Sequence, residues 1–324
     1  MLSKTQLHLK WIRSDTRMSF QFKMLIFLLA VTTVIVILMS IYTDWFRLMP
    51  NSCKCERCFS EEDVILSHYL NRSIEPFLSA TTNLPEEAFN WWLHLQSNRQ
   101  NFSYYKATID KLFKIFPSSP VLEKPSTDGC RTCAIVGNSV NLKGSHYGPL
   151  IDFQDVIIRI NYGQVKGYEE DVGTRTTHRV MYPESGSTLD NTTHLVLFAF
   201  KIKDLEWLIK SFPTGISGKP VKHRANKNLV MILNPAFMKY VHQIWLDKKG
   251  RYPSSGFMTL ILALHICDEV HVFGFGADRN GSWSHYWEPP KKKSFRTGPH
   301  PGQQESAMMH KLADEKTIKF YEGV

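Results

Sequence analysis

Residues 130–171 read CRTCAIVGNSVNLKGSHYGPLIDFQDVIIRINYGQVKGYEED, and this stretch decides the fold. Its apolar run 134–136 stops abruptly at Gly137, Asn138 and Ser139, the pattern of a buried strand that opens into a loop at its carboxyl end. A second apolar run, 156–160, also ends on a polar side chain, Asn161. Open α/β sheets bind ligands in the crevice beyond such strand ends, where these two amides would offer donors and acceptors to a sugar or a base. Equally, both asparagines could simply be turn residues.

Apolar runs and helical patterns alternate from Cys130 onward. We expect strands at 134–136, 156–160, 177–182, 194–200, 229–233 and 270–273. We expect helices at 204–212, 235–249 and 255–267, the second with Pro235 in its first turn and Gly250 at its end. Near-continuous Val, Ile and Leu strands separated by helices predict an α/β fold, with a Rossmann-like, mostly parallel sheet that is covered by helices on both faces.

The amino-terminal region predicts a membrane anchor. Residues 24–43 carry no charge and are mostly Leu, Ile, Val, Phe and Met, close to the roughly 20 residues that a helix needs to cross a bilayer. Basic residues precede this run and Asp44 follows it, which places the amino end in the cytosol. A cleaved signal peptide is the alternative, but the run is long and no clear small-x-small cleavage site follows. We expect a cytoplasmic tail at 1–23, a signal anchor at 24–43, a short stem at 44–60 and one lumenal domain at 61–324.

The chain has 324 residues and a formal net charge of +9, which suits an anionic partner such as nucleic acid, an anionic membrane or a charged small molecule. A nucleic-acid binder is disfavoured because the anchor would put the domain in the lumen. Lumenal thiols oxidise, so the six cysteines are expected in disulfides, and a zinc site on the C-x-C-x-x-C and C-x-x-C groups is the alternative. The N-x-(S/T) sequons fit the same compartment. They lie at Asn71, Asn101, Asn191 and Asn280.

Residues 61–116 have apolar residues at helical spacing and are predicted to be mostly helical. They contain the pair Trp91 and Trp92, followed by Gln96. Paired tryptophans usually pack in a core, and a platform for the apolar side of a hexose is the alternative.

The segment 251–256, RYPSSG, leads directly into an apolar helix. Ser254 and Ser255 are good amino-terminal caps, and that role alone would explain them. The same geometry presents free N–H groups and the positive end of the helix dipole to a phosphate. Gly256 would let a nucleotide approach the backbone closely.

Four segments, taken in order, resemble the motifs of the animal sialyltransferases. CAIVGNS and the later RIN match the large sialylmotif, and RYPSSG, followed by an apolar helix and GFG, matches the small one. The run His285-Tyr286 resembles the third motif, and His300-x-x-x-x-Glu305 the very small motif. The resemblance covers nearly all of the lumenal chain. The tryptophan pair with Gln96 and the stem cysteines bring it nearest to the α2,3-sialyltransferases that cap galactose β1,3-linked to N-acetylgalactosamine.

The resemblance implies a GT-A-like variant of the Rossmann-like fold. It also implies an inverting transfer from CMP-sialic acid to a galactose 3-hydroxyl, without a metal or another cofactor. By motif, His300 would be the base that takes the hydroxyl proton, since imidazole titrates near neutral pH, and His285 would stabilise the departing phosphate. Glu305 would orient His300, as a third group orients a base. The donor would be held by Asn138, Ser139, Asn161, Tyr252, Ser254, Ser255, Gly256 and Gly276. The acceptor galactose would be faced by Gln96, Trp283 and Tyr182.

The resemblance also implies the disulfides Cys133–Cys267, Cys55–Cys130 and Cys53–Cys58. The chain departs from close relatives in the loop at 211–228, which is shorter and lacks a tyrosine that reaches the donor phosphate in them. Residues 288–299, EPPKKKSFRTGP, fit no helical or strand period and are interpreted either as a surface loop or as a lid over the donor.

Two other interpretations stay open. A sialyltransferase of another linkage shares the large and small motifs. An inactive, lectin-like paralogue would bind glycans without transferring, although the presence of both histidines argues against it. The resemblance further implies a single-pass type II protein of the Golgi membrane that acts on glycoproteins, and it leaves open both glycolipid acceptors and a homodimer.

Overall fold

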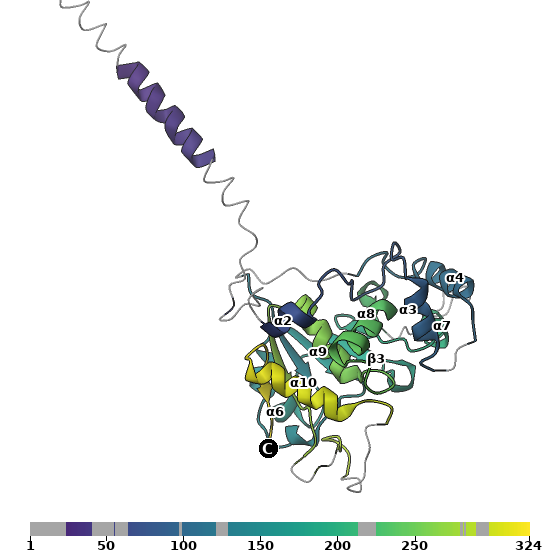
Figure 1. Ribbon diagram of the computed structural model, residues 1–324. Coiled ribbons are helices and arrows are strands. Elements are labelled where there is room, and N and C mark those ends of the chain that lie inside the picture. The colour runs from purple at the N-terminus through teal and green to yellow at the C-terminus, as the bar shows by residue number, and fades with distance from the viewer. Residues whose placement is uncertain are drawn as a thin grey trace, which may run out of the picture. The chain divides into compact units, whose positions relative to one another are not determined.

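The computed structural model describes residues 24–40, 55, 64–96, 99–120, 129–212, 225–278, 281, 283–289 and 298–324. The chain divides into two units, 1–52 and 53–324. In the first unit, residues 24–40 form a helix whose large apolar side chains are mostly exposed, drawn in purple in Figure 1. Within the described residues, no helix is both long enough and apolar enough to cross a membrane. Residues 41–43, which belong to the predicted anchor, lie outside this description.

The second unit is built on a seven-stranded sheet in which every pair of neighbouring strands is parallel, in the order β5-β4-β3-β2-β1-β6-β7. The strands are β1 Thr132–Val136, β2 Val156–Ile160, β3 His178–Met181, β4 His194–Leu197, β5 Val230–Ile232, β6 Glu269–Phe273 and β7 Lys319–Tyr321. The mostly parallel sheet is therefore confirmed. The prediction missed β7, and the predicted strand 194–200 was too long because the ladder to β5 ends at Leu197.

Alternate residues of the central strands point to opposite faces, and each face has its own core. Ile135 and Ile158 belong to the larger core, whereas Ala134 and Ile157 belong to a smaller core on the other face. All five residues of β2 are buried. Burial on both faces explains why these strands read as continuous apolar runs.

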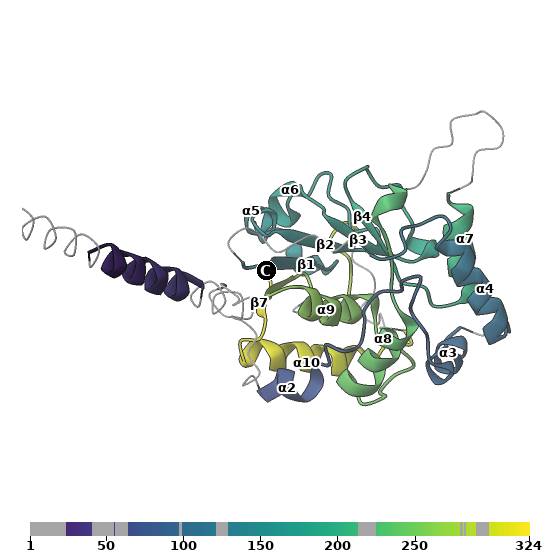
Figure 2. The ribbon, with the colours of Figure 1, turned by 90° about the horizontal axis from the view of Figure 1, so that it is seen from above.

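Helices cover both faces, as Figure 2 shows. Helix α9, Ser255–Ile266, packs against β1, β2, β3 and β6, and it is apolar on nearly all sides because α10, Gly302–Asp314, lies beyond it. The short helices α5, Gly148–Asp152, and α6, Glu169–Val172, lie on the opposite face. Neither of these two nor α10 was predicted. The helix predicted at 204–212 is α7, Ile202–Lys210.

The helix predicted at 235–249 is shorter. It consists of α8, Pro235–Tyr240, and a π-helical continuation, Val241–Trp245. Ahead of β1, less of the segment 61–116 is helical than predicted. The helices there are α2 Val64–Tyr69, α3 Glu86–Leu93 and α4 Phe102–Leu112, and the chain between α2 and α3 is irregular.

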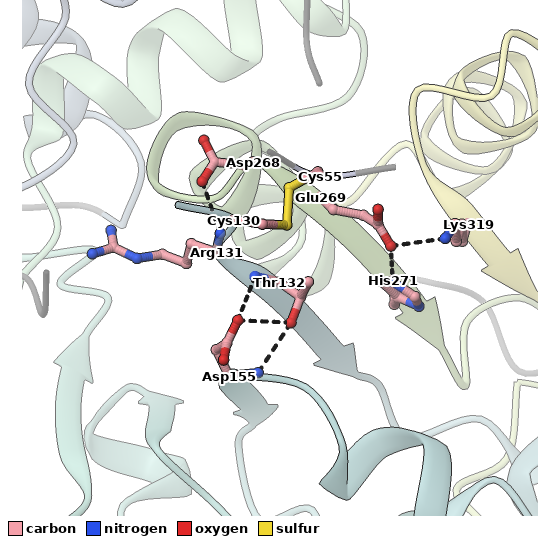
Figure 3. Close-up of a disulfide and its surroundings, with 9 residues drawn as sticks. All are labelled: Cys55, Cys130, Arg131, Thr132, Asp155, Asp268, Glu269, His271 and Lys319. Atoms are coloured by element: carbon pink, nitrogen blue, oxygen red, sulfur yellow. Dashed lines mark hydrogen bonds and ion pairs between the residues drawn. A yellow bond between two sulfur atoms is a disulfide. The ribbon is translucent and has the colours of Figure 1, made fainter. Parts of the chain in front are cut away.

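Two of the three predicted disulfides are present. Cys133 in β1 is bonded to Cys267, the residue that ends α9, so the bridge fastens this helix to an inner strand of the sheet. Cys55 is bonded to Cys130 just before β1. Figure 3 shows this second bridge beside the amino-terminal ends of β1 and β6, where Asp268 accepts a hydrogen bond from the backbone N–H of Arg131. Cys53 and Cys58 lie outside the described residues.

Candidate active site

The sheet has one topological switch point, between β1 and β6. Strands β1 to β5 follow one another outward, and the chain then returns to add β6 on the other side of β1. Parallel sheets open a crevice at the carboxyl ends of their strands at such a point. A cavity of about 390 Å³ lies there, and its walls include the loops that follow β1 and β6.

Every residue predicted for catalysis, donor binding or acceptor binding lines this one cavity. The predicted residues in the lining are Gln96, Asn138, Ser139, Asn161, Tyr182, Tyr252, Ser254, Ser255, Gly256, Gly276, Trp283, His285, His300 and Glu305. These residues are far apart in sequence, from Gln96 to Glu305, and the fold brings them together. The roles given to them remain predictions, and sequence reasoning missed other lining residues, among them Glu184, Phe200 and Phe275.

The loop after β1 is held rigidly against two other segments. Ser139 donates its backbone N–H to the carbonyl of Gly274, 2.9 Å away, and forms an isolated antiparallel bridge with His285. The backbone N–H of Tyr286 donates to the carbonyl of Asn138 at 3.1 Å. Gly137 has no room for a side chain, because a Cβ there would lie 2.3 Å from the carbonyl oxygen of Gly274. This packing fixes His285 beside the predicted donor-binding loop.

The two asparagines of the cavity lining differ in their hydrogen bonds. Asn138 donates its Nδ2 hydrogen to the carbonyl of Ile160 at 3.2 Å, and its buried Oδ1 has no hydrogen-bond partner in the described part of the chain. Asn161 accepts a hydrogen bond from the Ser185 hydroxyl at Oδ1, 3.0 Å away, which leaves its Nδ2 donors for a ligand. Asn161 has φ 54°, a left-handed conformation that asparagine tolerates better than most residues.

Buried Arg179 in β3 stabilises this turn. Its Nη1 donates to the carbonyls of Asn161 at 3.2 Å and Gly163 at 3.0 Å. Burial lowers the pKa of Arg179 below its usual value, but an arginine remains charged at any pH at which the protein is folded. Sequence patterns did not single out this arginine, because its partners are backbone groups of another strand end.

The amino end of α9 is capped as predicted. The Ser254 hydroxyl accepts a hydrogen bond from the backbone N–H of Phe257 at 3.1 Å. Gly256 was expected to let a nucleotide approach the backbone, but its nearest neighbour is an aromatic ring. A Cβ on Gly256 would lie 2.8 Å from the ring of Phe275. The glycine therefore makes room for an aromatic ring that itself lines the cavity.

His285 is held by an aromatic ring and a carboxylate. Its ring stacks on Trp287, with centroids 4.7 Å apart, and its Nδ1 lies 3.3 Å from a carboxylate oxygen of Glu288. The Nδ1 atom is buried and the contact lacks the geometry of a hydrogen bond, so it is a charge contact only, present when the imidazole is protonated.

His300 lies at the end of the cavity next to α10. Its Nδ1 is 3.2 Å from the carbonyl oxygen of Tyr252, and its ring meets the Tyr252 ring edge to face, with centroids 5.0 Å apart. A carbonyl oxygen only accepts, so Nδ1 carries the hydrogen and Nε2 the lone pair. Burial lowers the pKa of His300 below its usual value. The ring is therefore neutral, and able to accept a proton, at near-neutral pH.

Glu305 acts on the loop that holds His300. Its carboxylate accepts a hydrogen bond from the backbone N–H of Ser254 at 2.7 Å, and only 6 % of the residue is exposed. Burial raises the pKa of Glu305. Because Tyr252, two residues before Ser254, supplies the carbonyl for His300, Glu305 fixes the position of that carbonyl through the backbone.

The tryptophan pair belongs to the core and not to the cavity. Trp92 is fully buried and donates its Nε1 hydrogen to the carbonyl of Ala199 at 2.7 Å. Trp91 packs on the same core beside His242. The platform interpretation was wrong for Trp92, whereas Gln96, which follows in the chain, does line the cavity.

Several predictions fall outside the described residues. They concern Asn280, residues 290–297 of the segment interpreted as a lid, and residues 213–224 of the shortened loop. Asn71, Asn101 and Asn191 are exposed, and Asn101 also caps α4 by accepting a hydrogen bond from the backbone N–H of Tyr104. In the described part of the chain, no group of three or more His, Cys, Asp or Glu side chains could hold a metal ion.

The fold and the four motif segments assign the chain to a family. Residues 77–317 match glycosyltransferase family 29 (sialyltransferase), and the chain belongs to that family.

Individual relatives agree with this assignment. The chain is 44 % identical over 283 residues to the CMP-N-acetylneuraminate-beta-galactosamide-alpha-2,3-sialyltransferase 1 of Sus scrofa, covering 84 % of this chain and 82 % of the relative. It is 40 % identical over 286 residues to the type 2 enzyme of Mus musculus, covering 85 % and 81 % of the two chains. A crystal structure of a mammalian sialyltransferase in complex with Gal-beta-1-3GalNAc-ortho-nitrophenol superposes with a TM-score of 0.75 at 40 % identity, covering 84 % of this chain and all of the other.

Proposed function

We propose that this sialyltransferase moves sialic acid from CMP-sialic acid to the 3-hydroxyl of a terminal galactose on Gal-β1,3-GalNAc glycans, with inversion and without a metal. The observation that carries the proposal is the meeting of His285, His300 and the two asparagines in one cavity at the switch point of the sheet. The acceptor is proposed because relatives named for the α2,3 linkage are 40 to 44 % identical over most of the chain.

The proposed reaction gives the two histidines different tasks, proton removal and charge stabilisation. His300 Nε2 takes the proton of the galactose 3-hydroxyl, while that oxygen attacks the anomeric carbon of the sialyl group. The bond from this carbon to the CMP phosphate oxygen breaks, and its electron pair leaves with CMP. His285 Nε2 stabilises the negative charge that develops on the phosphate.

The donor and acceptor would occupy opposite sides of the cavity. The asparagines, Ser139 and the amino end of α9 would hold CMP-sialic acid, since amides and helix N–H groups suit a base, a ribose and a phosphate. Gln96, Tyr182 and Trp283 would face galactose, where an aromatic ring covers the apolar side of a hexose.

The proposal includes the cellular setting. The chain would be a single-pass type II protein of the Golgi membrane, anchored by residues 24–43, with its catalytic unit in the lumen, where it would act on glycoproteins and also on glycolipids. The apolar helix at 24–40 and the two disulfides support this setting, because disulfides persist in oxidising compartments. Homodimerisation is part of the same proposal.

One assay tests the reaction. Purified protein is incubated with CMP-sialic acid and a panel of β1,3- and β1,4-linked galactosides, and the linkage of each product is determined. We expect α2,3-linked product with CMP release, and the highest kcat/KM with Gal-β1,3-GalNAc. Products of another linkage would support the rival sialyltransferase activity, and glycan binding without transfer would support the lectin-like alternative.

A further inference from the structure

A lysine outside the four motif segments lies directly behind two residues of the cavity wall on the acceptor side. Lys201 is the residue that immediately precedes α7, after the short connection 198–200 that follows β4. Its ammonium group lies 3.2 Å from Gln96 Oε1 and 3.0 Å from Glu184 Oε1. Gln96 and Glu184 both line the cavity, and Lys201 itself does not.

A third contact fixes the lysine itself. Its Nζ lies 2.8 Å from Oδ1 of Asp204, whose side chain is buried. The other oxygen of Asp204 accepts the backbone N–H groups of Phe200 at 2.8 Å and Lys201 at 3.2 Å. Asp204 therefore holds both the backbone and the ammonium group of Lys201, and only 20 % of the Lys201 side chain is exposed.

The contact with Lys201 decides which end of the Gln96 amide faces a ligand. An ammonium group has donors and no acceptor, so the amide must turn its oxygen toward Lys201. Its Nε2 hydrogens are then left to donate to an oxygen atom in the cavity. Without the lysine, the amide could turn over and offer either end.

The same ammonium group favours the charged form of Glu184. Burial, the largest single influence, raises the pKa of Glu184, but the hydrogen bond and the charge of Lys201, together with a hydrogen bond from the backbone of Glu184, outweigh it, and the pKa lies below the usual value. Burial likewise would lower the pKa of Lys201, but Asp204 and Glu184 outweigh it and the pKa is raised. A charged carboxylate only accepts hydrogen bonds, so Glu184 can accept from a sugar hydroxyl.

We propose that Lys201 is a positioning residue for the acceptor sugar, which orients the Gln96 amide as a donor and the Glu184 carboxylate as an acceptor for two oxygen atoms of the galactose. This inference rests on the proposed function, and it adds Glu184 as a residue that contacts the acceptor. A donor and an acceptor held in fixed positions recognise a hydroxyl pattern, because a sugar with a misplaced hydroxyl loses one of the two hydrogen bonds.

The test is Lys201→Met, which keeps the length and apolar stem of the side chain and removes the ammonium group. We expect KM for Gal-β1,3-GalNAc to rise about 10-fold, the cost of one or two such contacts. KM for CMP-sialic acid and the slow hydrolysis of CMP-sialic acid without acceptor should change less than about 2-fold, since neither uses the galactose contacts. Lys201→Arg should recover much of the acceptor affinity.

The matched control is Lys239→Met. Lys239 also has a largely buried stem and an ion pair with a carboxylate, Glu87, but it links α8 to α3 away from the cavity. This variant should lose some thermal stability and keep both KM values.

Glu184→Gln is a second test, which does not depend on the folding of Lys201→Met. It leaves the contact of Lys201 with Asp204 intact. It should raise the acceptor KM and leave the donor KM unchanged. If either folded variant keeps the wild-type acceptor KM, or if donor and acceptor KM rise together, the inference is wrong. A wild-type protein that transfers nothing to galactosides would overturn the proposed function instead, so the two failures are distinguishable.

Discussion

The Nδ1 atom of His300 lies 3.2 Å from the carbonyl oxygen of Tyr252. This contact selects the tautomer that carries its lone pair on Nε2. Because Tyr252 begins the turn that caps α9, the catalytic base proposed here and the predicted donor site are positioned by the same few residues. The carboxylate of Glu305 ties this turn to α10 through Ser254.

Replacing the proposed base tests this arrangement directly. His300→Ala should lower kcat by about 10²- to 10⁴-fold, the usual contribution of a general base. The Kd for CMP, measured by titration calorimetry, should change little. His68→Ala, in an exposed histidine of α2, is the control and should keep full activity. Near-normal turnover by His300→Ala would mean that another group accepts the proton.

The pH profile should carry the signature of a buried imidazole. Burial lowers the pKa of His300, so the base stays unprotonated to a lower pH than an exposed histidine would. We expect kcat/KM to fall on acidification with an apparent pKa below about 6.5, the usual value for histidine. This acid limb should be absent from the residual activity of His300→Ala. An acid limb above this pH would assign the titration to another group.

Much of this fold was predictable, since the central strands are buried on both faces and read as unbroken apolar runs. Strand β7 was missed because it is a short edge strand with the sequence Lys-Phe-Tyr and exposed Lys319. Helix α10 was missed because only one side of it is buried and much of it is polar. Helix α9, buried on nearly all sides, was predicted by its cap, its length and its apolar content.

The residues of the cavity were predicted by motif, and their neighbours were not. Gln96 and Lys201 are 105 positions apart, and Asn161 and Arg179 meet through a backbone carbonyl. Contacts of this kind depend on how strand ends lie side by side, so no local pattern encodes them. Gly256 shows the same limit. The sequence predicted that a side chain would not fit at this position, but the group that fills the space is the ring of Phe275.

Removing the arginine beneath Asn161 should weaken donor binding. Arg179→Met leaves the carbonyls of Asn161 and Gly163 without their buried donor, a loss of about 1–3 kcal/mol in stability. The left-handed turn at Asn161 should loosen, and the Kd for CMP should rise about 5- to 10-fold, which corresponds to roughly 1 kcal/mol. Calorimetric titration with CMP and thermal unfolding provide the two readouts.

A second arginine separates the local effect from the general one. Arg131 also donates to a backbone carbonyl, that of Ile266 at 2.9 Å, but at the amino-terminal end of the sheet. Arg131→Met should lower the melting temperature and leave the Kd for CMP unchanged. An equal loss of CMP affinity in both variants would show that Arg179 acts on stability alone.

The disulfide from β1 to α9 should dominate the stability of the catalytic unit. Cys133 and Cys267 are 134 residues apart in sequence and both are buried, so the bridge closes a large loop of the unfolded chain. In the chain-entropy model such a bridge contributes about 4–5 kcal/mol. The double variant Cys133→Ala, Cys267→Ala should therefore lose a large part of the total free energy of unfolding, which urea denaturation followed by fluorescence would measure. Peptide mapping without reduction should find the Cys133–Cys267 link in the wild type.

The control is His68→Ala, which leaves both bridges intact and should unfold at nearly the wild-type urea concentration. A double variant as stable as the wild type would contradict the prediction, because the packing of α9 on β1 would then hold the helix in place without the covalent link.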